Sequence, residues 1–173
     1  MIYRRAEVRD AAALATFADR VFVSSFERQV PRAELTAIAR ERFTPERQET
    51  DIVDPAGTIF LALDQEMVGY AQLIVGNRPK CELVASAPAE LKRIYVDESW
   101  HGRGVAQSLL HHVKTRAREQ QCDVLWLAVW DQNARGIAFY EKEGFHLIGS
   151  SIFAVGNLSL VHNYMSMSLR DLS

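Results

Sequence analysis

Residues 90–121 constrain the fold most, because they combine an apolar run, a glycine-bearing loop and a long amphipathic stretch. The run at residues 91–96 is β-branched and aromatic and ends in polar residues, which predicts a strand. From Val105 to Ala117, apolar residues recur at helical spacing, which predicts a helix with one apolar face. The segment therefore predicts a strand, a loop and a helix in succession.

Two glycines, Gly102 and Gly104, lie in the loop between this strand and this helix. Glycine lets the backbone approach a ligand closely, and the amides at a helix start attract anions such as a diphosphate. The loop lacks the third glycine of the dinucleotide fingerprint and the Gly-Lys-Ser/Thr ending of a P-loop. We interpret residues 102–106 as a diphosphate site of another kind; a plain turn joining strand to helix is the alternative.

Length, charge and hydropathy exclude several classes of protein. The 173 residues, 48% of them hydrophobic, are enough for a single domain over residues 1–173. The net charge is -2, with 20 basic and 22 acidic residues mixed along the chain, which argues against nucleic acid or an anionic membrane as partner. Because no apolar stretch of about 18 residues and no apolar signal core occur, we expect a cytoplasmic protein.

The cysteines and histidines do not suggest a metal site. Cys81 and Cys122 are isolated, so they provide neither a disulfide framework nor metal-ligand spacing. His111 and His112 are adjacent on the expected helix and point in different directions, so they cannot share a metal. We expect no metal, a reducing compartment and both histidines at the surface.

The rest of the chain alternates helices and strands. Further strands are expected at residues 2–6, 58–63, 67–75, 124–130, 145–152 and 163–169. Further helices are expected at residues 11–23, from Pro31 onward, from a Thr44-Pro45 cap to residue 52, and at 131–143, with loops at 76–88 and 156–157. This order predicts a mixed α/β fold with a right-handed parallel crossover before residues 124–130.

Two segments resemble motifs of the GCN5-related N-acetyltransferases (GNAT). The string HGRGVA at residues 101–106 resembles Gln/Arg-x-x-Gly-x-Gly/Ala, with histidine where the family usually has Gln or Arg. Because backbone amides carry most of the phosphate contact, we expect binding to survive this change. Residues 133–145, NARGIAFYEKEGF, resemble N-x-x-A-x-x-x-Y-x-x-x-G-F, although Gly136 replaces a helix former. The resemblance covers essentially the whole chain, and the N-terminal pattern is similar to the PaiA-like polyamine acetyltransferase branch.

The resemblance implies a fold, a cosubstrate and a set of site residues. The fold would be α/β (mixed α+β), with a mixed, mostly antiparallel sheet of about seven strands flanked by helices. Acetyl-coenzyme A (acetyl-CoA) would be the cosubstrate, with no metal. The loop amides would cradle its diphosphate, the strand end and Asn133 would bind the pantetheine arm, and the first helices would wall the acceptor site. The implied cofactor-binding residues are Ile94, Tyr95, Val96, His101, Gly102, Arg103, Gly104, Val105, Ala106, Asn133 and Tyr140.

Three phenylalanines in the N-terminal part have two possible roles. Phe22, Phe26 and Phe43 would line the acceptor site by resemblance. Aromatic residues at helical spacing are more often core, which is the interpretation that we favour.

Acetyl transfer to an amine needs a base and an acid. An alkylammonium with a pKa near 10.4 is only about one part in 10³ neutral at pH 7. Glu90, at the start of the expected central strand, matches the general-base glutamate of the family's histone acetyltransferases; a water chain or a solvated carboxylate is the alternative. Tyr140 would protonate the departing thiolate, and Asn133 and Ile137 would lie on the same helix face as Tyr140. The alternative is that Asn133 only caps the helix and Tyr140 only packs against it. A backbone amide near residues 94–96 would stabilise the oxyanion.

The leading interpretation is an acetyl-CoA-dependent N-acetyltransferase, an acyltransferase that acts on a small amine, such as a polyamine or a similar metabolite, in a ternary complex. One alternative acceptor is a protein N-terminus or lysine. Another alternative, from a different class, is a non-catalytic regulator that senses acyl-CoA. A homodimer formed through the apolar C-terminal strand is possible, and the sequence does not identify the acceptor.

Overall fold

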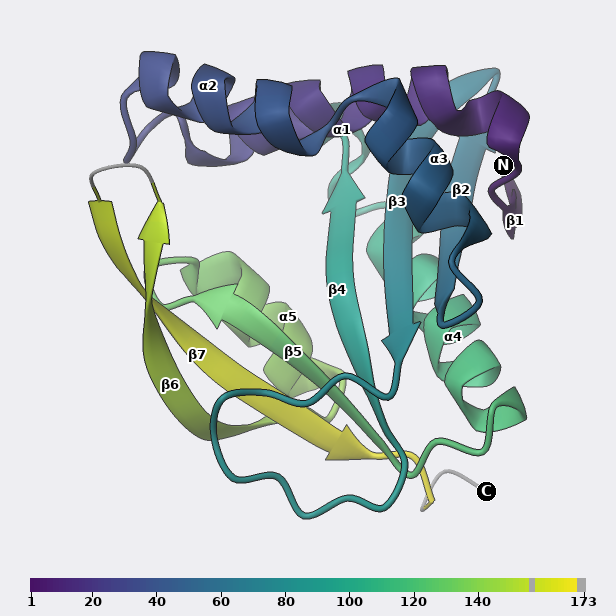
Figure 1. Ribbon diagram of the computed structural model, residues 1–173, viewed down its shortest axis with the longest axis vertical. Helices are drawn as coiled ribbons and strands as arrows, with labels where there is room; N and C mark the ends of the chain where they lie inside the picture. Colours follow the sequence, from purple (N-terminus) through teal and green to yellow (C-terminus); the bar gives the residue numbers. More distant parts are fainter. Residues whose placement is uncertain (156–157, 171–173) are drawn as a thin grey trace. The chain divides into compact units, whose positions relative to one another are not determined.

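The structure is a computed structural model that describes residues 1–155 and 158–170 (Figure 1). In chain order, its elements are β1 (Ile2–Arg5), η1 (Val8–Asp10), α1 (Ala11–Phe26), α2 (Arg32–Arg42), α3 (Pro45–Val53), β2 (Gly57–Asp64), β3 (Glu66–Val75), β4 (Pro88–Val96), η2 (Glu98–Trp100), α4 (Val105–Glu119), β5 (Val124–Trp130), α5 (Ala134–Lys142), β6 (His146–Val155) and β7 (Leu158–Ser168). The predicted order of strands and helices is confirmed. The loop predicted at residues 156–157 lies outside the described residues.

The strands form a seven-stranded sheet in the order β1-β2-β3-β4-β5-β7-β6. β4 and β5 are parallel, whereas β1 with β2, β5 with β7, and β6 with β7 are antiparallel. This arrangement confirms the predicted mixed, mostly antiparallel sheet. The chain divides into two compact units, residues 1–72 with 93–113 and residues 73–92 with 114–173.

The first unit is built around helix α1. Its apolar face is buried, and the ring of Phe17 contacts the edge of Tyr70 on β3 at 6.1 Å between centroids. The helix continues past its predicted end at residue 23, because Phe26 packs against Phe22 one turn earlier, at 5.2 Å. Helix α3 begins as predicted, with Thr44 Oγ1 accepting from the Arg47 amide at 3.2 Å.

Phe22 and Phe43 belong to the core of this unit, whereas Phe26 is half-buried. Phe22 and Phe43 are only 7% and 6% exposed, and their rings lie 5.5 Å apart. The structure therefore supports the core interpretation for these two residues.

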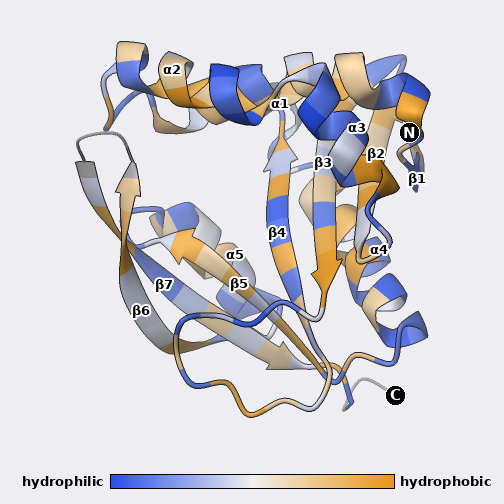
Figure 2. Cartoon of the chain, viewed as in Figure 1, coloured by the Kyte–Doolittle hydropathy of each residue, from blue (hydrophilic) through white to orange (hydrophobic). Residues whose placement is uncertain are grey.

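The second unit is organised around β5, which occupies residues 124–130 as predicted. Figure 2 shows the hydrophobic character of this strand, and all its residues pair with β7, from Val124↔Ser168 to Trp130↔His162. β7 begins earlier than predicted, because residues before Asn163 pair with β6. The pairing partner of these residues lies on another strand, so the start of β7 is not set by local sequence alone.

Asp123 joins the segment before β4 to the start of β5. Its carboxylate accepts hydrogen bonds from the amides of Ser86 (2.8 Å) and Ala87 (2.9 Å) and from Arg170 Nη2 (2.8 Å). Burial opposes its ionisation, but the two amides and the arginine outweigh burial and hold the pKa of Asp123 below its usual range. The ionised carboxylate therefore stabilises the fold.

Replacing Asp123 with asparagine is expected to lower the free energy of unfolding by about 2 kcal/mol at neutral pH. Because the folded-state pKa is lowered, this stabilisation is present above the ordinary carboxyl range and is lost as the pH falls through the lowered value. Urea unfolding at neutral and acid pH measures it, with Glu82→Gln on the exposed loop as control. If the difference in free energy of unfolding between wild type and Asp123→Asn were larger at acid pH than at neutral pH, this role would be contradicted.

Candidate functional site

The turn after β4 is fixed by Asp97. Its amide donates to Val68 O at 2.9 Å, and its carboxylate accepts from the amide (3.0 Å) and hydroxyl (2.6 Å) of Ser99 and from Arg20. The hydrogen bonds from Ser99 and then Arg20 lower the pKa of Asp97 to about 2. The carboxylate is thus ionised at neutral pH and holds the 3₁₀ turn η2 at the entrance to the glycine loop.

The glycine loop lies between β4 and α4, where the sequence predicted it. Gly102 and Gly104 adopt φ values of +74° and +79°, in the left-handed region that favours glycine. Among the atoms of residues 1–155 and 158–170, a Cβ at Gly102 would meet none within 4 Å, and a Cβ at Gly104 would meet Gln107 Oε1 at 3.8 Å. Ser108 N donates to Gly104 O at 3.0 Å, as a helical bond at the start of α4. The amides of Val105 and Ala106 come before Ser108 in the first turn, where helix amides have no partner within the helix. The loop thus presents an open backbone at the positive end of a helix of 15 residues.

The side chains beside these glycines contact the protein itself. His101 Nε2 donates to Val96 O at 2.9 Å, which ties the loop to the end of β4. Arg103 is exposed, with its guanidinium 4.9 Å from the ring centre of Trp100. The histidine in the place of Gln or Arg therefore has a role in closing the loop.

The end of β4 lies close to β3. A Cβ on Gly69 would meet Tyr95 O at 3.0 Å and Val96 Cγ2 at 3.3 Å, so any larger residue would crowd this approach. The ring of Tyr95 stacks on Tyr70 at 5.9 Å, and burial raises its pKa. Because side chains alternate along a strand, Ile94 and Val96 project from the opposite face. The side chains of Ile94, Tyr95 and Val96 therefore project from both faces of the sheet.

In the second unit, Glu90 lies in a hydrogen-bonded network. Its side chain is buried, its Oε2 accepts from Asn77 Nδ2 at 2.8 Å, and Lys92 Nζ lies 3.8 Å from the same oxygen. Trp126, opposite Glu90 in the parallel register, donates from Nε1 to Asn77 O at 2.8 Å. The alternative of a solvated strand-end carboxylate is wrong, because β4 begins at Pro88 and Glu90 lies inside it.

Sequence reasoning missed Asn77 and Trp126. Asn77 lies in a loop and Trp126 in an apolar strand, and neither position carries a local signal for contact with Glu90. The residues Pro88–Glu90 of β4 pair with Val124–Trp126 of β5. Within the described part of the chain, Glu90 is the last residue of β4 that pairs with β5.

Asn133 lies at the start of helix α5. The helix begins at Ala134 rather than at residue 131, and Asn133 is its N-cap, with Oδ1 accepting from the Gly136 amide at 2.9 Å. The structure thus has the capping Asn that the sequence left as the alternative, and the contact of Asn133 with pantetheine stays a prediction. A Cβ on Gly136 would lie 2.6 Å from Asn133 Nδ2, so the glycine makes room for this cap.

Tyr140 is half-buried near the end of α5. Its ring lies at an angle to Phe139 and Phe145, at 5.4 and 5.7 Å. Gly144, with φ +93°, ends the helix as predicted, and Phe145 N donates to Tyr140 O at 2.9 Å. The backbone of Tyr140 is thus fixed by the helix end.

His112 and the two cysteines are at least partly buried. His112 is half-buried between Tyr3 and Phe60, at 5.4 and 5.6 Å, so the prediction that it lies at the surface is wrong; burial, and secondarily His111, lowers its pKa. Burial raises the pKa of both thiols, Cys81 and Cys122. Within residues 1–155 and 158–170, no group of His, Cys, Asp and Glu side chains is placed to hold a metal ion. None of the helices described there is long and apolar enough to span a membrane.

Comparison with known proteins gives consistent matches. The model of the acetyltransferase (GNAT) family matches residues 21–145. An uncharacterised N-acetyltransferase of Mycobacterium tuberculosis is 30% identical over 148 residues, covering 85% of this chain and 90% of that protein. The PaiA N-acetyltransferase of Thermoplasma acidophilum, solved in complex with coenzyme A, has a TM-score of 0.79 at 18% identity, covering 96% of this chain and 98% of that one. The ribosomal-protein-alanine N-acetyltransferase of Brucella melitensis has a TM-score of 0.68 at 20% identity, with coverage of 97% and 99%.

Proposed function

Because the chain belongs to the acetyltransferase (GNAT) family, whose members use acetyl-CoA, we propose that it acetylates the primary amine of a small molecule directly, in a ternary complex. The observation that carries this proposal is the open glycine loop at the start of α4, which suits a diphosphate. The acceptor is a polyamine or a metabolite of similar size, as the resemblance to the PaiA-like branch implies. Bound acetyl-CoA supplies the activated acetyl thioester.

Each part of the coenzyme is assigned to residues of this chain. The backbone amides of residues 102–106 bind the diphosphate, with His101 holding the loop closed and Arg103 adding an exposed cation. Ile94, Tyr95 and Val96 bind the pantetheine arm through their backbone groups. Because Asn133 Oδ1 is used by the helix cap, its Nδ2 is the atom that donates to a pantetheine carbonyl.

Glu90 is the proposed general base. Asn77 and Lys92 both approach its Oε2, and its Oε1 has no hydrogen bond recorded among residues 1–155 and 158–170. Oε1 is therefore the atom that takes a proton from the acceptor ammonium, directly or through water. Tyr140 is the proposed acid that protonates the thiolate as it leaves. Burial disfavours the thiolate forms of Cys81 and Cys122, which argues against an acetyl-cysteine intermediate.

The acceptor is tested by thiol release from acetyl-CoA across a panel of amines, beside a calorimetric titration with the coenzyme alone. The panel contains spermidine, spermine, amino acids, aminoglycosides and short peptides. Turnover with a small amine supports the proposal, whereas turnover restricted to peptides would favour a protein acceptor. Tight coenzyme binding with no turnover on any amine would contradict the enzyme and favour a sensor.

Replacing Asn77 with alanine is expected to lower kcat/KM about tenfold near neutral pH, because the Glu90 side chain loses its hydrogen-bond donor. The Kd of the coenzyme should stay within about twofold. Glu82→Ala, exposed on the same loop, is the control. An equal loss of kcat/KM and of coenzyme affinity would show that Asn77 does not act through Glu90.

We further propose a homodimer and a cytoplasmic location. The expected contact through the apolar C-terminal strand is wrong, because β7 is already paired with β5 on one side and β6 on the other. β6 lies at the edge of the sheet and exposes Leu147 and Ile152, which suits pairing with a second copy. Light scattering of the purified protein measures the oligomeric state.

A further inference from the structure

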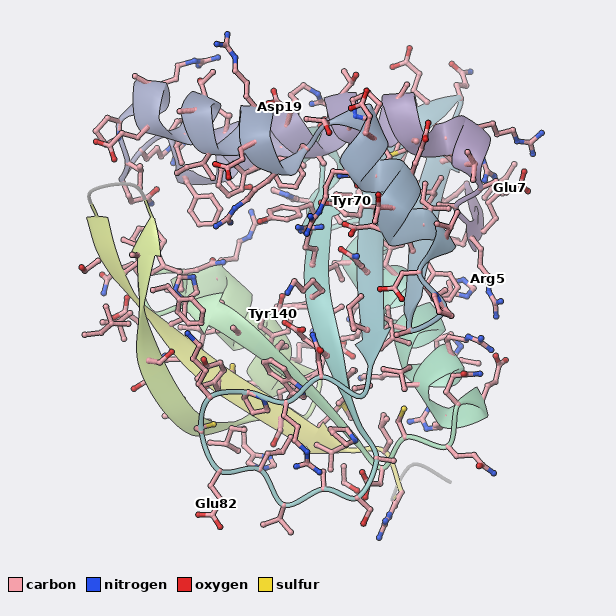
Figure 3. All side chains as sticks on the ribbon, viewed as in Figure 1. Arg5, Glu7, Asp19, Tyr70, Glu82 and Tyr140 are labelled. Atoms are coloured by element: carbon pink, nitrogen blue, oxygen red, sulfur yellow. The ribbon has the colours of Figure 1, made fainter. Side chains whose placement is uncertain are left out.

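A polar cluster lies inside the first unit, between the strands β3 and β4 and the helix α3. We call it the Arg93 cluster. Its centre is Arg93, which donates hydrogen bonds to Asp51 and Gln72 and, like Asp51, acts electrostatically on Tyr70. We include Gln48, which lies one helical turn before Asp51 on α3. Figure 3 shows one member, Tyr70, below α1. Gln48 and Tyr70 are 0% exposed and Gln72 is 2% exposed. The cluster is thus largely removed from water although every member is polar.

Two members of the cluster have buried polar atoms without a partner. Neither the amide oxygen nor the amide nitrogen of Gln48 makes a hydrogen bond within the described part of the chain, and the Tyr70 hydroxyl makes none either. Leaving such groups unpaired costs roughly 1 to 3 kcal/mol each, and buried polar groups are nearly always paired. Gln48 lies one helical turn before Asp51, so both project from the same side of α3. The cluster therefore has hydrogen-bonding capacity that the described residues do not use.

Arg93 is held in place but keeps unused donors. Its Nη1 donates to Gln72 Oε1 at 2.7 Å and to Asp51 Oδ2 at 3.3 Å, and its guanidinium lies 5.3 Å from the ring centre of Phe43. Nε and Nη2 have no hydrogen bond recorded among the described residues, and the side chain is 18% exposed. A fixed guanidinium with a free edge is suited to a bidentate bond with a carboxylate.

The charges around the cluster are predominantly positive. The second oxygen of Asp51, Oδ1, is 3.8 Å from Arg47 Nε, so two arginines share this one carboxylate. Arg93 and Arg42 both act electrostatically on the Tyr95 hydroxyl, which stacks on Tyr70. Two arginines therefore share one carboxylate, which favours an anionic group on the ligand and disfavours a further cation.

We propose that the Arg93 cluster binds a carboxylate of the acetyl acceptor, so that the acceptor is a small amine of the amino-acid class. This assignment rests on the proposed acetyltransferase function and selects one acceptor class within it. The Arg93 guanidinium binds the carboxylate, and the Tyr70 hydroxyl and the Gln48 amide pair with the remaining polar atoms of the acceptor. A polyamine lacks the carboxylate and places additional positive charge near these arginines.

The test compares acceptors that differ at the carboxylate, namely lysine, lysinamide and cadaverine, in wild type and Arg93→Gln. In wild type, kcat/KM for lysine should exceed that for cadaverine by about tenfold or more. Arg93→Gln should reduce this preference at least about tenfold, mainly through the KM of lysine. The Kd of the coenzyme should stay within about twofold, which distinguishes an acceptor carboxylate from a coenzyme phosphate.

A second variant, Tyr70→Phe, tests the assignment independently in case Arg93→Gln does not fold. Tyr70→Phe removes the unpaired hydroxyl without changing the ring, so the melting temperature should stay equal or rise. The KM of lysine should still increase about threefold to tenfold, while that of cadaverine changes less. Equal preference for lysine and cadaverine in wild type, or a preference unchanged in both variants, would overturn the assignment and leave the transferase intact. Absence of turnover with every amine, including the wider panel, would overturn the proposed function itself.

Discussion

Replacement of Tyr140 by phenylalanine is expected to lower kcat by about 10²- to 10⁴-fold, the usual contribution of a general acid. The thiolate then leaves without a proton donor, although the ring packing against Phe139 and Phe145 is retained. The Kd of the coenzyme should change less than about threefold, because the variant loses only a hydroxyl group. Steady-state kinetics and calorimetry on the same preparation measure the two quantities.

Tyr3→Phe provides a matched control for the loss of a hydroxyl. Tyr3 packs against His112 in the first unit and has no assigned role in the reaction. Its replacement should leave kcat unchanged. Equal losses of turnover and of coenzyme affinity in Tyr140→Phe would reject the acid role.

Replacement of Gly104 by valine is expected to raise the Kd of the coenzyme about 100-fold or more. A β-branched residue is strained at φ +79°, and its side chain would occupy the open space in front of the loop amides. Calorimetry with coenzyme A measures the loss, and thermal unfolding measures the strain.

Gly76→Val separates the two causes, because Gly76 also has a positive φ of +85° and open space around it but lies in another loop. It should show a comparable loss of stability, with a coenzyme Kd within about threefold of wild type. If both variants lost affinity equally, general strain rather than the glycine loop would explain the effect.

The parts of the fold with local signals were predictable from the sequence. The glycine loop required positive φ at Gly102 and Gly104, and the buried apolar run at residues 124–130 formed a strand with the predicted bounds. The Thr44-Pro45 cap also predicted the start of α3 correctly. The bounds that differed depend on tertiary partners, such as Phe26 on Phe22 at the end of α1 and the pairing of β7 with β6.

The surroundings of the candidate site were less predictable. Glu90 was identified by its position in the motif, but its burial and its bond to Asn77 depend on a loop whose sequence gives no such signal. Asn133 was identified by its spacing, but its side chain caps α5, and Gly136 is needed beside it. The Arg93 cluster joins a helix and two strands that are far apart in the sequence, so only the folded chain brings its residues together.

The central claim, direct transfer of acetyl from acetyl-CoA to an amine, is tested most directly by initial rates measured while both substrates are varied. We predict intersecting lines in the double-reciprocal plot, because both substrates must be bound before transfer. Parallel lines, together with an acetylated cysteine trapped on the reaction path, would contradict the account.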